Sequence, residues 1–227
     1  MRYDIVALVL LAGAVLAWIY RRDKRRFEAE RAMLFEDARG LLTEAEQTRA
    51  PNEYPRIHGR YHGHAVAIDA VLDTIAVRKL PSLWLRVTVL TELPFAGTCD
   101  VLARAHNVEF YSPASTLDHV LALPAGWPDH LTVKSDNPEA MPPEAILTRH
   151  IRVFDDPQLK ELLVTPRGVR LVRQAAQGAR AEYMVLRQAA FGPVKVPREQ
   201  LQALLDAAVA LAEALKAEKP ATNGVAA

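Results

Sequence analysis

The hydrophobic positions begin with one uninterrupted apolar run near the N-terminus. Ile5 to Tyr20 are sixteen consecutive uncharged positions, and nine of them are Leu, Ile or Val. At a helical rise of about 1.5 Å per residue this run is roughly 24 Å long, slightly shorter than a bilayer core of about 30 Å. Trp18 and Tyr20 suit the headgroup level at one end. The pattern predicts a transmembrane anchor over residues 1–20.

The residues directly after this run predict the orientation of the anchor. Only Asp23 opposes five closely spaced basic residues, namely Arg21, Arg22, Lys24, Arg25 and Arg26. Basic flanks stay on the cytoplasmic side, so we expect a single-pass protein of the inner (plasma) membrane with its N-terminus outside and its main domain in the cytoplasm. The five side chains are also predicted to contact the membrane surface, because they attract anionic lipid. The lipid bilayer is therefore the first predicted partner.

Three alternatives to this anchor stay open. One is a cleaved signal peptide, although Arg2 is offset by Asp4 and the run ends in Trp-Ile-Tyr-Arg-Arg instead of small residues. Another is a buried core helix, although the run is apolar on all faces and is followed by basic residues. The last is a spanning helix of opposite orientation.

Residues 21–49 carry a helical pattern and predict a juxtamembrane helix interrupted only by Gly40. Phe27, Leu34 and Leu41 are spaced by seven residues and share one face with Ala38 and Ala45. We expect this face to pack on the domain or to lie along the membrane. The alternative is a protein partner or self-association through residues 27–45, as in a short coiled coil. Residues 50–56, which include Pro51, form the predicted linker.

From residue 57 the apolar period changes from helical to alternating. Leu83, Leu85, Val87 and Val89 alternate with more polar positions and give the clearest strand. A hairpin or a bent strand is expected around Gly63. The predicted strands are Ile57–Tyr61, His64–Val71, Leu83–Val89, Asp100–Ala105 and Leu131–Lys134.

The C-terminal half adds helices and one more predicted hairpin. Pro142-Pro143-Glu144 predicts the start of a short helix, and Asp156-Pro157 predicts another, which would turn Leu159, Leu162 and Leu163 inward. Two alternating runs around Gly178, Gly168–Gln174 and Arg180–Gln188, predict a hairpin. A periodic apolar face predicts a final helix over Arg198–Glu218. The fold class is therefore α+β over residues 57–218, a mainly antiparallel sheet with the C-terminal helix packed on it and a disordered tail at 219–227.

Composition narrows the function classes. The chain has 227 residues and a formal net charge of +1, which argues against a nucleic-acid partner. The single cysteine, Cys99, excludes an internal disulfide and is expected to be an inert buried thiol. The sequence holds no nucleophile elbow, zinc-protease motif, phosphate loop or dinucleotide fingerprint. We therefore predict no catalytic residue, no metal and no cofactor.

The densest group of candidate side chains is the run from His58 to His64. In a straight strand His58, His62 and His64 would share one face with Arg60, because side chains repeat every second residue. Three imidazoles on one face are a candidate metal or ligand site. A fixed positive charge at Arg60 and the neighbouring glycines favour a solvated hairpin instead, with an anion or lipid headgroup as the intermediate alternative.

Two further groups of charged residues are candidate sites. Arg170, Arg173 and Arg187 make the late predicted hairpin basic, so they are candidate contacts for an anionic partner or for lipid headgroups. Asp155 and Asp156 could act as paired carboxylates, but a helix start at Asp156 explains them more simply.

The stretch Gly59-Arg60-Tyr61-His62-Gly63-His64-Ala65-Val66 after a membrane helix resembles a pattern in uncharacterised bacterial membrane-anchored proteins of unknown function. Arg167-Gly168-Val169-Arg170-Leu171, followed by a C-terminal helix, is similar to the same proteins over most of residues 57–215. The resemblance implies a bacterial protein with an α+β domain on a tether. It carries no activity and no site residues with it.

These observations give three hypotheses of function. The first is a non-enzymatic binding or scaffolding domain, tethered to the membrane on its cytoplasmic side. The second is an enzyme acting on a membrane-proximal substrate through the histidine run or the Asp155–Asp156 region. The third is an exported domain whose anchor is reversed or cleaved.

Overall fold

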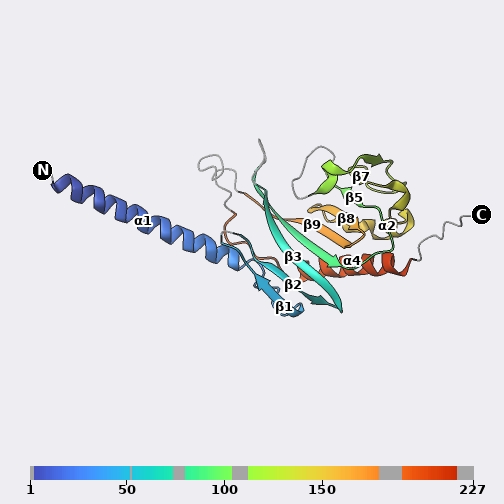
Figure 1. Cartoon of the computed structure of the whole chain (residues 1–227), viewed down its shortest axis with the longest axis horizontal. Coiled ribbons are helices and arrows are strands. Elements are labelled where there is room, and N and C mark those ends of the chain that lie inside the picture. Colours follow the sequence, from blue (N-terminus) through green and yellow to red (C-terminus); the bar gives the residue numbers. More distant parts are fainter. Residues whose placement is uncertain (1–2, 52, 74–79, 104–111, 179–190, 219–227) are drawn as a thin grey trace, which may run out of the picture.

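The computed structural model describes residues 3–51, 53–73, 80–103, 112–178 and 191–218. Its first element is helix α1, Tyr3–Ala32, which projects away from the remaining elements (Figure 1). The predicted apolar helix is therefore present and continues well past Tyr20. Within the described residues, α1 is the one helix long and apolar enough to cross a membrane, a test that a signal sequence also passes.

Nine strands in the described part of the chain form one antiparallel sheet. Their order is β1-β2-β3-β4-β9-β8-β5-β7-β6. The first five strands are β1 (Thr43–Thr48), β2 (Arg56–Tyr61), β3 (His64–Asp73), β4 (Ser82–Leu90) and β5 (Cys99–Leu102). The others are β6 (His119–Leu121), β7 (Thr132–Ser135), β8 (Leu159–Thr165) and β9 (Gly168–Gln177). The predicted α+β class with a mainly antiparallel sheet is thus confirmed.

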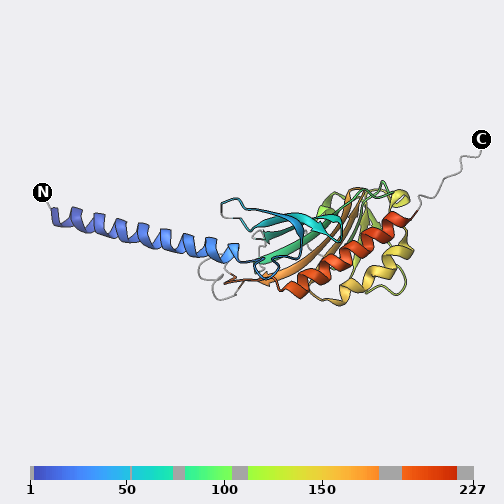
Figure 2. The same cartoon turned by 90° about the horizontal axis from the view of Figure 1, so that it is seen from below.

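One face of this sheet is covered by helices. Helix α4, Arg198–Ala217, runs along the sheet beside the shorter helix α2, Glu144–His150 (Figure 2). The predicted alternation of β4 explains the packing, because Leu83, Leu85, Val87 and Val89 all point into the main core with the leucines of α4. Three short 3₁₀ turns complete the described elements: Pro113–Thr116, Pro138–Ala140 and Ile151–Asp155. The C-terminal helix and the helix after Pro143 are both confirmed.

The opposite side of the sheet, here called the second face, carries the alternate residues of the same strands. Trp84 and Val172 form a small apolar cluster there, apart from the main core. Register places Asp69 of β3 beside Arg86 of β4, and Arg86 beside Val172 of β9. The second face therefore mixes apolar and charged side chains, whereas the main core lies on the helix-covered face.

The juxtamembrane helix predicted over residues 21–49 is wrong beyond Ala32. From Met33 to Leu41, backbone amides donate instead to carbonyls three residues earlier, as in tight turns. Gly40 adopts a positive φ of 77°. Leu34 and Phe35 are buried in the main core, so this part of the predicted apolar face packs within the domain. Residues 43–48 then pair with β2 as an edge strand. Leu34 is consequently not part of an exposed self-association seam.

The helix predicted to start at Asp156 is also wrong, because Leu159–Thr165 is strand β8. Asp156 does act as a capping residue, but it closes a turn: Oδ1 accepts from the amide of Gln158 at 2.8 Å, and the carbonyl accepts from that of Leu159 at 3.0 Å. Leu162 lies in the main core and Leu163 on the second face, both buried. Since β8 is covered on both sides, its sequence lacks the alternation that marks a half-exposed strand.

The late hairpin has different partners from those predicted. Strand β9 pairs with β8 on one side and with β4 on the other. The β8–β9 connection is the two residues Pro166 and Arg167, and Gly168 sits so close to Val89 that a Cβ atom would lie 2.0 Å from its carbonyl oxygen. The predicted partner run, Arg180–Gln188, lies outside the described residues.

Candidate functional site

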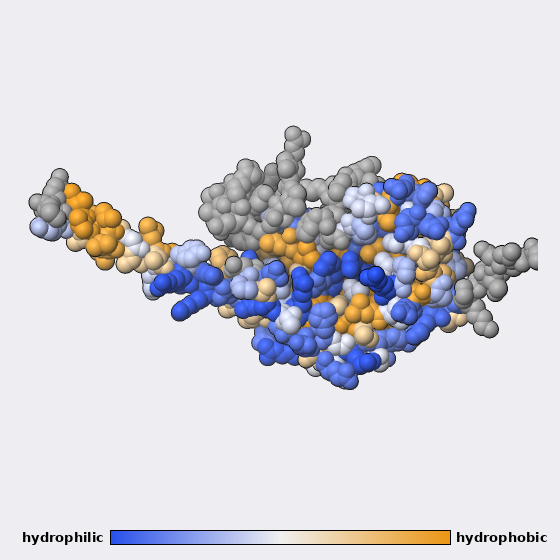
Figure 3. Space-filling view, viewed as in Figure 1, coloured by the Kyte–Doolittle hydropathy of each residue, from blue (hydrophilic) through white to orange (hydrophobic). Residues whose placement is uncertain are grey.

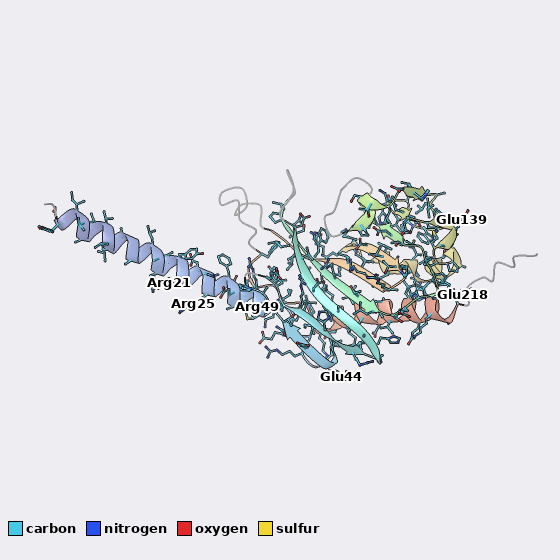
Figure 4. All side chains as sticks on the ribbon, viewed as in Figure 1. Arg21, Arg25, Glu44, Arg49, Glu139 and Glu218 are labelled. Carbon is cyan, nitrogen blue, oxygen red and sulfur yellow. The ribbon has the colours of Figure 1, made fainter. Side chains whose placement is uncertain are left out.

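Over Tyr3–Phe27, helix α1 presents its side chains to the surroundings. Every described residue from Tyr3 to Phe27 is exposed, and none in the helix is buried. The apolar end and the charged stretch that follows it are distinct along the helix (Figure 3). The five predicted membrane-surface residues all belong to this charged stretch, and Arg21 and Arg25 project from the middle of the helix (Figure 4).

The charged part of α1 is reinforced within the helix. Arg26 pairs with Glu30 at 2.8 Å, and Lys24 lies 3.9 Å from Glu28, both with the i, i+4 spacing of one helical face. The guanidinium of Arg22 lies 5.6 Å from the centre of the Trp18 ring, which joins the aromatic end to the basic flank. This stretch is therefore a helical spacer between the apolar run and the domain.

The C-terminal end of α1 is attached to the domain by specific contacts. Arg49 donates from Nη1 to the carbonyl of Glu28 at 2.6 Å, and Arg31 lies over the ring of Tyr54 at 5.6 Å. Just beyond the helix, the amide of Val196 donates to the carbonyl of Leu34 at 2.8 Å. Lys195 pairs with Glu36 at 2.8 Å, and this hydrogen bond lowers the pKa of the Glu36 carboxyl. These contacts fix the direction in which the helix leaves the domain.

The three candidate histidines do not converge. His62 and Gly63 form the two-residue turn of the β2–β3 hairpin, with φ of 48° and 83°, so the chain does not stay extended through the run. His64 Nε2 lies 3.0 Å from Glu213 of α4, whereas His58 lies across from Glu46 of the edge strand. Among the described residues, no group of three or more His, Cys, Asp or Glu side chains could hold a metal ion.

The candidate arginines are also separated. Arg170 lies on the second face and donates to Thr88 at 3.3 Å, whereas Arg173, three positions along the strand, lies on the helix-covered face. Arg173 donates to Asp156 Oδ2 at 2.6 Å; burial raises the pKa of Asp156, but this bond and the Gln158 amide bring it below its usual value. Arg187 lies outside the described residues.

The second face contains a site that the sequence did not suggest, formed by two buried carboxyl groups. Asp100 on β5 and Glu161 on β8 each have no exposed surface. Register pairs Leu102 with Glu161 and Asp100 with Leu163, so the two acids are diagonal neighbours on adjacent antiparallel strands. Such neighbours have Cα atoms about 7–8 Å apart, within reach of long side chains. The buried hydroxyl of Ser112 lies beside them.

Hydrogen bonding leaves most of these carboxyl oxygens unsatisfied. Ser112 donates its hydroxyl hydrogen to Asp100 Oδ2 at 2.8 Å. Asp100 Oδ1 and both oxygens of Glu161 have no hydrogen-bond partner in the described structure. Leaving a buried acceptor without a donor costs about 1–3 kcal/mol, and more for a charged group. The environment therefore disfavours two ionised carboxylates.

The electrostatics of the pair agree with this geometry. Burial raises the pKa of Asp100 to about 6, opposed by the Ser112 hydroxyl and by the positive charges of Lys134 and Arg170. Burial, and then the nearby charge of Asp100, raise the pKa of Glu161 to about 8. The Ser112 hydroxyl is close enough to lower the pKa of Glu161 as well, but its one hydrogen is already donated to Asp100.

The positively charged side chains near the Asp100–Glu161 pair donate hydrogen bonds to other acceptors. Arg86 forms a two-point ion pair with Asp69, and Lys134 donates to the carbonyl of Ala114 at 2.9 Å. Arg170 donates to Thr88. They reduce the cost of burying negative charge without supplying the missing donors.

Sequence reasoning missed this pair because each acid stands alone in an apolar strand. Cys99-Asp100-Val101-Leu102 and Leu159-Lys160-Glu161-Leu162-Leu163 contain no recognisable motif. Cys99 itself is buried as expected, and burial raises the pKa of its thiol to about 12. A single acid inside a strand covered on both sides indicates a buried carboxyl group. That signal could be used for Glu161 only once β8 was known to be a strand.

Comparison of the chain with protein-family models, with curated proteins and with solved structures found no match. The resemblance drawn from the sequence is therefore supported only in its coarse form, an N-terminal apolar helix followed by an α+β domain with an antiparallel sheet.

Proposed function

We propose that this chain is a non-enzymatic binding or scaffolding domain tethered by α1 to the inner (plasma) membrane of a bacterium. In this proposal the N-terminus is outside, and the sheet domain lies in the cytoplasm. The observation that carries the tether is the apolar half of α1, because none of its described residues is covered by the chain. Burying apolar surface is favourable by about 25 cal/mol per Å², so these side chains need an apolar medium.

The orientation rests on the basic flank. The five basic residues of positions 21–26 lie on the same continuous helix as the apolar run, at its domain side. Positive residues next to a span are retained in the cytoplasm, and the aromatic ring of Trp18 stacked near Arg22 suits the interface between the two regions. The helical spacer then holds the domain away from the headgroups by about 18 Å, the length of twelve helical residues.

A binding or scaffolding function is favoured because the surface candidates for chemistry have structural partners. His64 contacts Glu213, Arg173 and Asp156 bind each other, and Arg170 contacts Thr88. Side chains used in this way support the fold and leave its surface for partners.

A topology measurement tests the tether and its orientation. A reporter active only in the cytoplasm and a reporter active only in the periplasm are fused in turn to the C-terminus of the full chain. The proposal expects activity of the cytoplasmic reporter alone. Activity of the periplasmic reporter alone would contradict it and favour the exported alternative, with a reversed or cleaved anchor.

The second candidate is an enzyme acting on a membrane-proximal substrate, favoured by the Asp100–Glu161 pair. Two carboxyl groups whose environments hold their pKa values apart are typical of general acid and base partners. Against it, neither side chain has exposed surface through which a substrate could reach it. An activity of the purified chain that is lost in Glu161→Gln but kept in the triple variant His58→Ala, His62→Ala, His64→Ala would favour the enzyme and contradict the binding domain.

A further inference from the structure

Within the described residues, the buried acids on the second face have fewer hydrogen-bond donors than acceptor oxygens. Four carboxyl oxygens belong to Asp100 and Glu161, and one of them accepts from Ser112. The other three have no partner in the described structure. One proton placed between the two groups turns one carboxylate into a donor and satisfies two of those three oxygens at once.

The surrounding charges permit such a proton and do not replace it. Among the described residues, the cations that act on the pair are Arg86 on β4, Arg170 on β9 and Lys134 on β7. Asp69 on β3 lies on the same face, beside Arg86. Asp69 is bound to Arg86, while Arg170 and Lys134 donate to other acceptors. The remaining positive field stabilises one negative charge on the pair. A second negative charge would meet both the first one and the apolar neighbours Leu102 and Leu163.

We propose that Asp100 and Glu161 share a single proton and so act as one proton-binding site on the second face. In this site Glu161 holds the hydrogen and Asp100, which already accepts from Ser112, carries the charge. The pair binds its proton on folding, because an unfolded chain exposes both groups to water. Folding is therefore linked to pH through this face, independently of the tether proposed above.

The sign of this linkage follows from the direction of the two shifts. Both carboxyl groups have a raised pKa in the folded state, so the folded chain binds more protons than the unfolded chain near neutral pH. The stability that proton binding supplies is complete below the unfolded carboxyl pKa values of about 4. It is lost progressively as pH rises from there through the folded values of about 6 for Asp100 and about 8 for Glu161. The domain is thus expected to weaken on the alkaline side.

Two readouts on the full chain in detergent micelles test the proposal. The first is the infrared absorption of protonated carboxyl groups at pH 7, measured as wild type minus Glu161→Gln. Glu139→Gln, which changes an exposed acid in the Pro138–Ala140 turn, is the matched control. We expect one protonated carboxyl band in the first difference spectrum, shifted in heavy water, and none in the control difference. The absence of a band in the Glu161→Gln difference would overturn the shared proton.

The second readout is the pH dependence of Tm. The wild-type Tm should fall by at least about 5 °C between pH 6 and pH 9, because a domain of this size then loses the stabilisation that the bound proton supplies. Because the amide of Gln cannot ionise, Glu161→Gln should show a much smaller fall and exceed the wild type at pH 9. Asp100→Asn, which removes the other charge, should also flatten the curve. Parallel curves for wild type and both variants would contradict the proposal.

Discussion

Helices α1 and α4 are both rich in apolar residues, but they meet opposite surroundings. Eight residues of α4 are buried: Leu201, Leu204, Leu205, Ala208, Val209, Leu211, Ala212 and Leu215. No residue of α1 is buried. The apolar positions of α4 form one stripe that matches one sheet face, whereas residues 5–20 are apolar on all sides. The sheet covers the apolar stripe of α4, whereas no described part of the chain covers the apolar run of α1.

The largest expected effect comes from placing charge in the middle of the apolar run. Its nine Leu, Ile and Val residues favour insertion by roughly 3–5 kcal/mol in total, whereas each central arginine costs about 2.5–3.5 kcal/mol. Leu10→Arg with Leu11→Arg therefore cancels the gain, and we expect the chain to move from the membrane pellet to the soluble fraction. The matched control places the same charges on the exposed side of α4, Gln202→Arg with Ala203→Arg. Loss of membrane attachment in the α4 control alone would contradict the assignment of the anchor to α1.

The next effect concerns orientation. Replacing the five basic residues of positions 21–26 by glutamate should turn a C-terminal reporter from the cytoplasmic to the periplasmic side in a large share of molecules, because the flank is no longer basic. Reversing a single exposed charge on the domain, Arg152→Glu, is the control and should leave the reporter unchanged. An unchanged reporter in the flank variant would show that another feature sets the orientation.

Truncating a leucine in each helix separates their roles in stability. Leu205 of α4 has no exposed surface, so Leu205→Ala should lower the free energy of unfolding of the domain by about 2–5 kcal/mol. Leu10 is 69% exposed, and Leu10→Ala should change the same quantity by less than about 0.5 kcal/mol. Urea denaturation followed by tryptophan fluorescence measures both. Equal losses would mean that α1 packs on the domain.

A smaller loss than that of Leu205→Ala is expected from removing a polar contact between α4 and the β2–β3 hairpin. Tyr61 donates its hydroxyl to Asp206 Oδ1 at 2.6 Å. Tyr61→Phe keeps the buried ring and removes this bond, so we expect a loss of about 1 kcal/mol in the free energy of unfolding. Membrane attachment should not change. The same denaturation experiment checks it, and a loss as large as that of Leu205→Ala would show that the contact does more than position the helix.

Two of the elements that were predicted correctly have one apolar and one more polar face. Helix α4 and strand β4 have one covered and one more polar face, so their periods of 3.6 and 2 are visible in the sequence. Strand β8 is covered on both sides, and Leu162 and Leu163 are buried on opposite faces. Without an alternation, its leucines resembled a helical stripe after a plausible cap at Asp156.

The other errors arose where tertiary contacts decide the structure. Phe27, Leu34 and Leu41 keep a helical spacing, but burial of Leu34 and Phe35 in the domain replaces the helix with tight turns. The histidines are close in sequence, yet the turn at His62 and Gly63 separates their side chains. Asp100 and Glu161 are sixty-one positions apart and meet only through the register of β5 with β8. No local pattern could report that contact.

The central claim is that the uncovered apolar half of α1 stays attached to the chain and spans the bilayer. Alkaline extraction of membranes that contain the full-length protein, followed by the intact mass of the chain, tests it most directly. The account predicts that the chain remains in the membrane pellet with residues 1–20 still present. Release into the supernatant, or a mass that lacks the apolar run, would contradict it.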